Sequence, residues 1–263
     1  MPTWIIENYT KEKSFLELVQ SIKSSGFPLI EIRDDYTKDL LSQITGNVVV
    51  NGSISMCKLI SKDLPDLTDG LICPSFRKYL CSEYCSRFGG LLFNDKYVIM
   101  SLNELNRQKF FVYGMLGKDG VVFLRPDSGE KPFIAQLVDI QDLNDFCITN
   151  SHIGHELVLV STPKNIVWEG RFVCSGTEVI AQSTYKFQGV LTQIPSVPIQ
   201  ALDVLKCVLA IGYNPDPVFC VDICGTPDNE FFLLELSAFS SSGLYACDKK
   251  KIVDRVSEIA MNP

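Results

Sequence analysis

Two carboxylates, Asp222 and Glu235, lie in neighbouring segments whose apolar residues alternate as they do in β-strands. A turn centred on Asp228-Asn229 would join these segments into a hairpin and set Asp222 opposite Glu235, with Ser237 on the same face. Opposed carboxylates repel each other, so a hard divalent cation would stabilise them, and an Asp222→Asn change should leave the protein equally or more stable. A register displaced by one residue would instead separate the acids and leave an ordinary polar surface. The expected apolar face consists of Val221, Ile223, Phe232, Leu234 and Leu236.

Two cations, Arg125 and Lys131, flank the sequence Pro126-Asp127-Ser128-Gly129, which is typical of a turn between two strands. Cations at the neck of a hairpin can converge on a phosphate group, the arginine through its planar fork and the lysine as a point charge. Exposed arginine and lysine are common, so a solvated hairpin tip is the alternative.

Glu169 and Arg171 are two residues apart in a strand-like segment, so their side chains share one face. That segment and residues 177–186 are expected to form a hairpin around Ser175-Gly176. Opposite charges at this spacing can simply pair with each other, and an exposed pair of that kind stabilises a protein little.

Strand-like and helix-like segments alternate through the first ninety or so residues, as they do over a parallel sheet. This Rossmann-like half would bind ligands at its strand ends, near Glu7-Asn8 and Asn51-Gly52-Ser53. The expected strands are residues 3–8, 28–33 and 47–52, and the expected helices are residues 13–26, 34–44 and 74–89. The first helix should stop at Gly26 and turn inward Phe15, Leu16, Leu18, Val19 and Ile22.

From Tyr97 onward the pattern changes to hairpins and separate helices. The clearest helix is expected from Pro198, where a missing N–H group costs nothing, to Gly212, and the last begins near Asp248. Further helices are expected within residues 101–111 and 140–152, and strands within residues 120–138 and at 157–161.

The composition is that of a folded globular protein, with 46% hydrophobic and 21% charged residues in a chain of 263. The net charge of −7 argues against nucleic acid or acidic membranes as partners. We expect a cytoplasmic protein, because the N-terminal apolar run is too short for a signal peptide and no stretch approaches the ~18 apolar residues of a membrane span. Most of the ten cysteines are expected to be reduced core thiols. The spacings of Cys81/Cys85 and Cys220/Cys224 differ from those of common zinc sites.

The order of several segments resembles the ATP-grasp superfamily. Those segments are FLRPDSGEKPF, LVLVSTPKNIVWEGRFVCSG, VFCVDIC and FFLLELSAFSSSGLYACD. They are most similar to the clade named for two conserved arginines and a lysine, known largely from phage and bacterial genomes. The resemblance implies an α/β (α+β) ATP-grasp fold. It places a Rossmann-like pre-ATP-grasp domain at residues 1–95 and an ATP-grasp domain at 96–263, with subdomains 96–160 and 161–263.

The same resemblance implies that ATP is held between the two subdomains. Arg125 and Lys131 match the family's phosphate-contacting cations, and Glu169 and Arg171 match its Glu-x-Arg strand. Arg171 and Lys131 are the expected catalytic residues, with Arg171 reaching the transferred phosphate and the substrate.

Mg²⁺ is the second cofactor that the resemblance implies. Asp222 and Glu235 match the metal-binding acids, which agrees with the hairpin register argued above. The chain has Glu235-Leu236-Ser237 where the superfamily commonly has Glu-x-Asn. Serine still offers an oxygen ligand, but its shorter reach weakens the case for a second metal ion.

The resemblance implies an ATP-dependent carboxylate-amine ligase that acts through an acyl phosphate, on an amino acid, a peptide or a protein terminus. One alternative is a non-catalytic nucleotide-binding or phage-host interaction protein with a decayed site, which Ser237 favours. Another is a kinase that stops after phosphate transfer.

Overall fold

Two units make up the chain in the computed structural model, Met1–Ser75 with Ile166–Pro263, and Phe76–Asn165. The structure describes residues 1–8, 13–32, 41, 44, 46–63, 71 and 76–262. The helix expected over residues 34–44 therefore lies, except for two positions, outside the described residues. The boundaries expected at residues 95/96 and 160/161 stay predictions.

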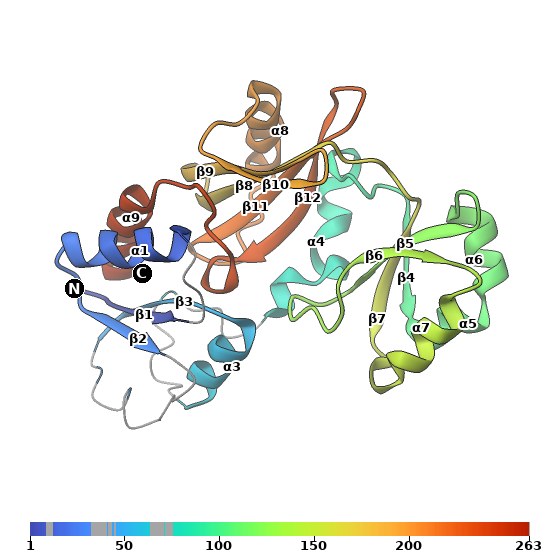
Figure 1. Cartoon of the computed structure of the whole chain (residues 1–263), viewed down its shortest axis with the longest axis horizontal. Coiled ribbons are helices and arrows are strands. Elements are labelled where there is room, and N and C mark those ends of the chain that lie inside the picture. Colours follow the sequence, from blue (N-terminus) through green and yellow to red (C-terminus); the bar gives the residue numbers. More distant parts are fainter. Residues whose placement is uncertain are drawn as a thin grey trace. The chain divides into compact units, whose positions relative to one another are not determined.

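A parallel three-stranded sheet forms the N-terminal part of the first unit, in the order β2-β1-β3 (Figure 1). Its strands are β1 (Thr3–Glu7), β2 (Leu29–Ile32) and β3 (Val48–Asn51). The helices α1 (Lys13–Ser24) and α3 (Ile54–Asp63) follow β1 and β3. The alternation of strand and helix is thus confirmed as a parallel sheet. Within α1, Leu18 and Ile22 are buried as expected, whereas Leu16 is 55% exposed, so the predicted inward face was too wide.

An antiparallel five-stranded sheet forms the rest of this unit, in the order β10-β9-β8-β11-β12. Its strands are β8 (Trp168–Ser175), β9 (Glu178–Phe187), β10 (Val190–Ile194), β11 (Phe219–Gly225) and β12 (Phe231–Ala238). Two helices pack on it: α8 (Ile199–Ala210) contacts β11 and β12, and α9 (Lys249–Met261) contacts β9. Both expected hairpins and both helices are confirmed, while β10 was not anticipated.

The core of the first unit forms around α9, which also contacts β3 and α1 (Figure 1). The Trp4 indole N–H donates to the Ser257 hydroxyl at 3.0 Å, and both side chains are fully buried. Asp248 caps the helix by accepting from the Lys251 amide at 3.0 Å. One continuous apolar cluster therefore joins the parallel sheet to the end of the antiparallel sheet.

The second unit has an antiparallel four-stranded sheet in the order β4-β7-β5-β6. The strands are β4 (Tyr97–Ser101), β5 (Val121–Pro126), β6 (Gln136–Asp139) and β7 (Leu157–Ser161). Its helices are α4 (Cys81–Phe88), α5 (Leu102–Arg107), α6 (Lys109–Leu116) and α7 (Leu143–Thr149), with short 3₁₀ helices at Phe76–Tyr79, Gly89–Leu91 and Ser151–Ile153. Inward residues of β5 and β7, such as Val122 and Val160, build a separate core.

The connection between β5 and β6 differs from the expected tight turn. Because Leu124 pairs with Gln136, the chain between the strands extends well beyond Pro126-Asp127-Ser128-Gly129. Arg125 lies within β5 and pairs with Leu159 of β7, whereas Lys131 lies in the connecting loop. The two cations are therefore held by different kinds of structure.

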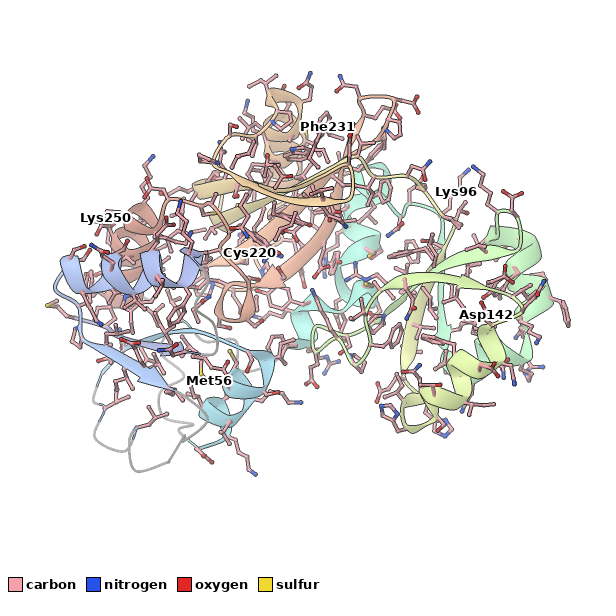
Figure 2. The ribbon with its side chains drawn as sticks, in the orientation of Figure 1. Met56, Lys96, Asp142, Cys220, Phe231 and Lys250 are labelled. Carbon is pink, nitrogen blue, oxygen red and sulfur yellow. The ribbon has the colours of Figure 1, made fainter. Side chains whose placement is uncertain are left out.

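Buried free thiols run through the first unit, and Cys220 on β11 is labelled in Figure 2. Burial raises the pKa of Cys57 and of Cys220 to about 11, and that of Cys247 to about 12. In the unfolded chain such thiols ionise near pH ~8.5. A raised folded pKa means that their contribution to stability is complete below that pH and is lost as the pH rises toward 11.

We therefore expect the free energy of unfolding to fall by roughly 1 to 3 kcal/mol for each such thiol between about pH 8.5 and pH 11. Thermal melts across this range measure the fall. Cys220→Ala should flatten the profile relative to wild type, whereas Cys207→Ser, at an exposed position, should not. A wild-type profile that is level up to pH 11 would contradict this reading.

Among the described helices, none is long and apolar enough to cross a membrane.

Candidate active site

The β11–β12 hairpin places the two predicted carboxylates opposite each other. Asp222 and Glu235 are direct partners across the strands, as expected, although Gly225 nearer the turn pairs with Phe231, one residue off the register predicted from Asp228-Asn229. The pairing then shifts by one residue, and Ile223 faces Leu233. This β-bulge makes Leu234 the extra residue and turns Leu233 inward, so the prediction that Phe232 and Leu234 share the buried face was wrong.

Arg171 continues the same row across the sheet. Arg171, on β8, pairs with Asp222 of β11 on one side and with Ser183 of β9 on the other. Because directly paired residues point to the same side of a sheet, one face carries a polar row. That row consists of Ser183, Arg171, Asp222 and Glu235.

A buried two-point ion pair joins Arg171 to Asp222. The arginine Nε donates to Asp222 Oδ1 at 2.9 Å, and Nη2 donates to Oδ2 at 2.8 Å. The exposed fractions of the two side chains are only 9% and 4%. The third nitrogen, Nη1, donates to the Gly243 carbonyl at 2.9 Å. Burial opposes the charge on Arg171, yet the attraction of Asp222 more than offsets it and raises the pKa of the guanidinium well above its ordinary value.

Two stacked tyrosines lie over the guanidinium. The rings of Tyr185 and Tyr245 are 4.7 Å apart with 16° between their planes. Arg171 Cζ lies 5.8 Å from the first ring centroid and 5.1 Å from the second, within the range of cation–π attraction. Burial is the main reason that the pKa of each phenol is raised. The pair is thus held in a dry, aromatic setting that strengthens its electrostatic attraction.

Glu169 is engaged separately from Arg171. Its Oε2 accepts from the Tyr185 hydroxyl at 2.7 Å, and its Oε1 pairs with Lys186 at 2.9 Å. Gly170, between Glu169 and Arg171 in the sequence, is required sterically, since a Cβ there would lie 2.3 Å from the Trp168 ring. Arg171 thus pairs with Asp222, and the alternative of an ion pair with Glu169 is not what the structure contains.

The three predicted metal ligands do not form a set that fits Mg²⁺ in this arrangement. Asp222 gives both oxygens to Arg171. The Ser237 hydroxyl lies 3.1 Å from that of Ser242, which in turn donates to the Ala238 carbonyl. Within the described ranges no group of three or more His, Cys, Asp or Glu side chains is placed to hold a metal. Mg²⁺ demands several oxygen ligands, and the oxygens of Asp222 and Ser237 are engaged in these other bonds.

Arg125, in the second unit, is a buried cation on β5 with 8% exposure. Two residues on, Asp127 accepts from the Ser82 amide at 2.9 Å and so caps the start of α4. A hydrogen bond from Cys85 is the main reason that the pKa of the Cys81 thiol is lowered, and the nearby charge of Arg125 adds to the effect. The guanidinium therefore lies in a largely desolvated setting.

Lys131 is exposed and has a left-handed backbone, with φ 51°. Such a conformation is unfavourable for a side chain with a Cβ and is often maintained for function. The loop that carries it packs closely at Gly129, where a Cβ would lie 2.8 Å from Phe76 Cβ and 2.9 Å from its carbonyl oxygen. This contact fixes the loop to the 3₁₀ helix Phe76–Tyr79.

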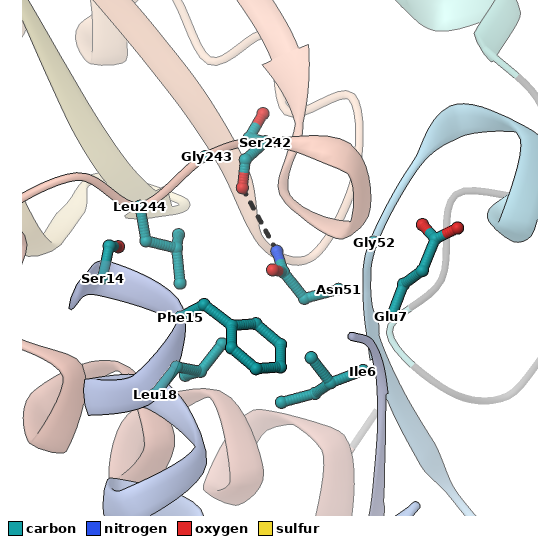
Figure 3. A pocket seen from close by; sticks show the side chains of 10 residues that line it. All are labelled: Ile6, Glu7, Ser14, Phe15, Leu18, Asn51, Gly52, Ser242, Gly243 and Leu244. Atoms are coloured by element: carbon teal, nitrogen blue, oxygen red, sulfur yellow. Dashed lines mark hydrogen bonds between the residues drawn. The ribbon is translucent and has the colours of Figure 1, made fainter. Parts of the chain in front are cut away.

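A small cavity of about 60 Å³ lies at the carboxyl ends of β1 and β3, where the sequence predicted ligand binding (Figure 3). Asn51 donates to the carbonyls of Phe239 at 3.0 Å and of Ser242 at 3.2 Å, which draws the segment after β12 against β3. The apolar wall includes Phe15 and Leu244. Ser242 and Gly243 also line it, so the residue that accepts from Arg171 forms part of this cavity.

Comparison with known proteins rests on structure. No family model matches the chain, and no curated protein matches its sequence. Solved structures match it along nearly its full length. A RimK domain protein ATP-grasp from Sphaerobacter thermophilus DSM 20745 is 11% identical with a TM-score of 0.65, covering 97% of this chain and 99% of that one.

Two further solved structures are similar to the chain over nearly its full length. D-alanine–D-alanine ligase from Bacillus anthracis is 12% identical with a TM-score of 0.66, covering 100% of this chain and 98% of that one. The chain has the α/β ATP-grasp fold. ATP-grasp ligase PsnB, complexed with a phosphomimetic variant of its minimal precursor, Mg and ADP, is 10% identical with a TM-score of 0.59. The match covers 99% of this chain and 98% of that one.

Proposed function

We propose that the protein is an ATP-dependent carboxylate-amine ligase that acts through an acyl phosphate. The observation that carries the proposal is the likeness to ATP-grasp ligases over nearly the whole length of both chains. The motif resemblance adds the clade named for two arginines and a lysine. Fold alone does not determine chemistry, so the proposal depends equally on the cations and acids that the chain places on its strands.

We propose that Arg125 and Lys131 bind the phosphates of ATP. A guanidinium held in a strand offers a rigid fork, and a lysine on a loop can adjust to a second phosphate group. Mg²⁺ enters the proposal as the ion that accompanies the ATP phosphates, as Mg accompanies ADP in the PsnB complex. The geometry of Asp222 and Ser237 gives no support for a protein-held ion, so no step depends on one.

The proposed reaction has two steps. An oxygen of the substrate carboxylate attacks the γ-phosphorus, the bond to the β–γ bridging oxygen breaks, and ADP leaves. The nitrogen of an amine then attacks the acyl carbon, inorganic phosphate leaves, and the nitrogen releases a proton. Fixed cations stabilise the charge on the phosphoryl oxygens, and the protein supplies no covalent nucleophile.

A non-catalytic nucleotide-binding protein is the second candidate. The observation that favours it is the buried pair, because Arg171 already binds Asp222 and Gly243 in this structure. An arginine bound in this way can contact a transferred phosphate only after it releases these partners. If it keeps them, its role is limited to positioning other groups.

Mg·ATP at millimolar concentration is expected to raise the melting temperature of the protein. A ligand present at 100 times its Kd and bound only by the folded state stabilises that state by about 2.7 kcal/mol. Thermal melts with Mg·ATP, with Mg²⁺ alone and with Mg·GTP measure the shift and its specificity. If Mg·ATP leaves the melting temperature unchanged, both the ligase and the nucleotide-binding proposals are wrong.

ADP release distinguishes the remaining functions. The assay supplies pooled amino acids, peptides and small carboxylates with and without amines. Release that needs both a carboxylate and an amine supports the ligase, and release that needs only the carboxylate indicates a kinase. Binding of Mg·ATP without ADP release from any pool supports the non-catalytic protein.

A further inference from the structure

We propose that Arg171 is the permanent counter-charge of Asp222, at the position where a divalent ion was expected, and that the pair positions the Ser242–Leu244 wall of the small cavity. In this proposal Arg171 is a positioning residue that acts through the Gly243 carbonyl. It does not depend on ligase activity, because it concerns only contacts within the first unit.

Arg171 engages both carboxylate oxygens of Asp222. A carboxylate that accepts two parallel N–H bonds from one guanidinium has its charge neutralised by a partner of ideal shape. If an ion displaced Arg171 from Asp222, the arginine would lose its counter-ion. Only 9% of the arginine side chain is exposed, so water could not replace that counter-ion. The stacked tyrosines, which attract the guanidinium, add to that cost.

The third nitrogen of Arg171, Nη1, reaches the segment after β12. It binds the Gly243 carbonyl, and Gly243 lines the cavity between Ser242 and Leu244. Asn51 holds the same segment from β3 through the Ser242 carbonyl (Figure 3). An amide on the parallel sheet and a guanidinium on the antiparallel sheet therefore both hold the wall, to which Lys249 on α9 adds a bond to the Leu244 carbonyl at 3.5 Å.

The contacts of Arg171 with Asp222 and Gly243 require a particular side-chain chemistry. Holding a carboxylate by two oxygens and a backbone carbonyl at once needs three donors in a rigid plane. Lysine keeps the charge but has no planar fork, so Arg171→Lys should retain attraction to Asp222 while losing the link to Gly243. This variant separates positioning from charge.

Manganese titration tests the first half of the proposal. Mn²⁺ reports its binding by electron paramagnetic resonance, and we use Mn²⁺ alone, without nucleotide. Wild type and Asp222→Asn are expected to hold the same amount of Mn²⁺. If wild type binds Mn²⁺ and Asp222→Asn loses that binding, Asp222 is a metal ligand and the proposal is overturned. Should Asp222→Asn fail to fold, the double variant Arg171→Met/Asp222→Leu, which carries no carboxylate at position 222, replaces it, and equal Mn²⁺ binding is again the expected result.

Hydrogen exchange tests the second half. In Arg171→Lys, amides of Ser242 to Ala246 should exchange on the order of tenfold faster than in wild type, while amides of α9 stay unchanged. The matched control is Arg255→Lys, which removes an exposed fork to Glu178 in the same unit and leaves the loop untouched. Unchanged exchange in Arg171→Lys, or an equal increase in Arg255→Lys, overturns the positioning role. Neither measurement uses nucleotide, so failure here is distinct from failure of the ligase proposal.

Discussion

Arg171→Met is expected to lower the free energy of unfolding by about 3 to 5 kcal/mol, because it leaves the Asp222 carboxylate buried without its counter-charge. Methionine has a similar length and no charge, so loss of packing contributes little to the change. Denaturant unfolding at neutral pH, with the slope of the transition compared between proteins, measures the loss. Asp222→Asn should also be destabilising, since it leaves the arginine unpaired.

The double variant Arg171→Met/Asp222→Leu is the control. Replacing a whole buried ion pair with apolar residues is often neutral or stabilising, so the double variant should recover most of the stability that either single variant loses. Arg255→Met supplies the exposed counterpart, where a loss of about 0 to 1 kcal/mol is expected. If Arg171→Met lowers the free energy of unfolding no more than Arg255→Met does, the buried pair stabilises the fold no better than an exposed one, and this prediction is wrong.

This expectation reverses the one drawn from the sequence. Considered alone, the Asp222–Glu235 pair is a repulsion, so Asp222→Asn would relieve it. Asp222 does pair with Glu235 as predicted from the turn, but the prediction omitted the third strand, β8, which pairs with β11 on its other side. Arg171 lies 51 residues before Asp222, and no local pattern states which strand will pair with β11. Arg171 on β8, rather than Glu235 on β12, therefore determines whether Asp222→Asn raises or lowers the stability of the protein.

Local rules predicted the elements well where periodicity and caps agreed. The helices α8 and α9 and the β8–β9 hairpin formed as expected because Pro198, Asp248 and the glycine after Ser175 each act within a few residues. The strands β1, β2 and β3 followed from their short apolar runs, and their parallel order followed from alternation with helices.

Local rules failed where a contact with a distant element decides the conformation. The β-bulge beside Asp222 shifts Leu233 inward without any signal in the strand pattern. The loop after β5 is longer than a four-residue turn, and its Gly129 packs on the 3₁₀ helix Phe76–Tyr79, about fifty residues upstream in sequence. Tyr185 could have been placed on the face of Ser183 by its spacing, but the stacking of Tyr245 on it depends on the path of a loop.

Lys131→Gly is expected to stabilise the protein and to weaken nucleotide binding at the same time. The left-handed backbone at Lys131 costs about 1 to 2 kcal/mol, and glycine removes that cost while adding about 0.4 to 1 kcal/mol of freedom to the unfolded chain. A net gain of roughly 0.5 to 1 kcal/mol follows. Loss of a cation that binds phosphate should raise the Kd for Mg·ATP about tenfold or more, which corresponds to about 1.4 kcal/mol.

Two controls isolate these effects. Gln188→Gly changes another left-handed residue, φ 48°, in the turn between β9 and β10, and should give the gain in stability with no change in Kd. Lys131→Met removes the charge without relieving the backbone, and should give the loss of affinity with no gain in stability. Denaturant unfolding and calorimetric titration with Mg·ATP supply the two numbers for each variant. If Lys131→Gly and Gln188→Gly match in both, the conformation at Lys131 is a feature of the loop alone, and the phosphate-binding role passes to Arg125.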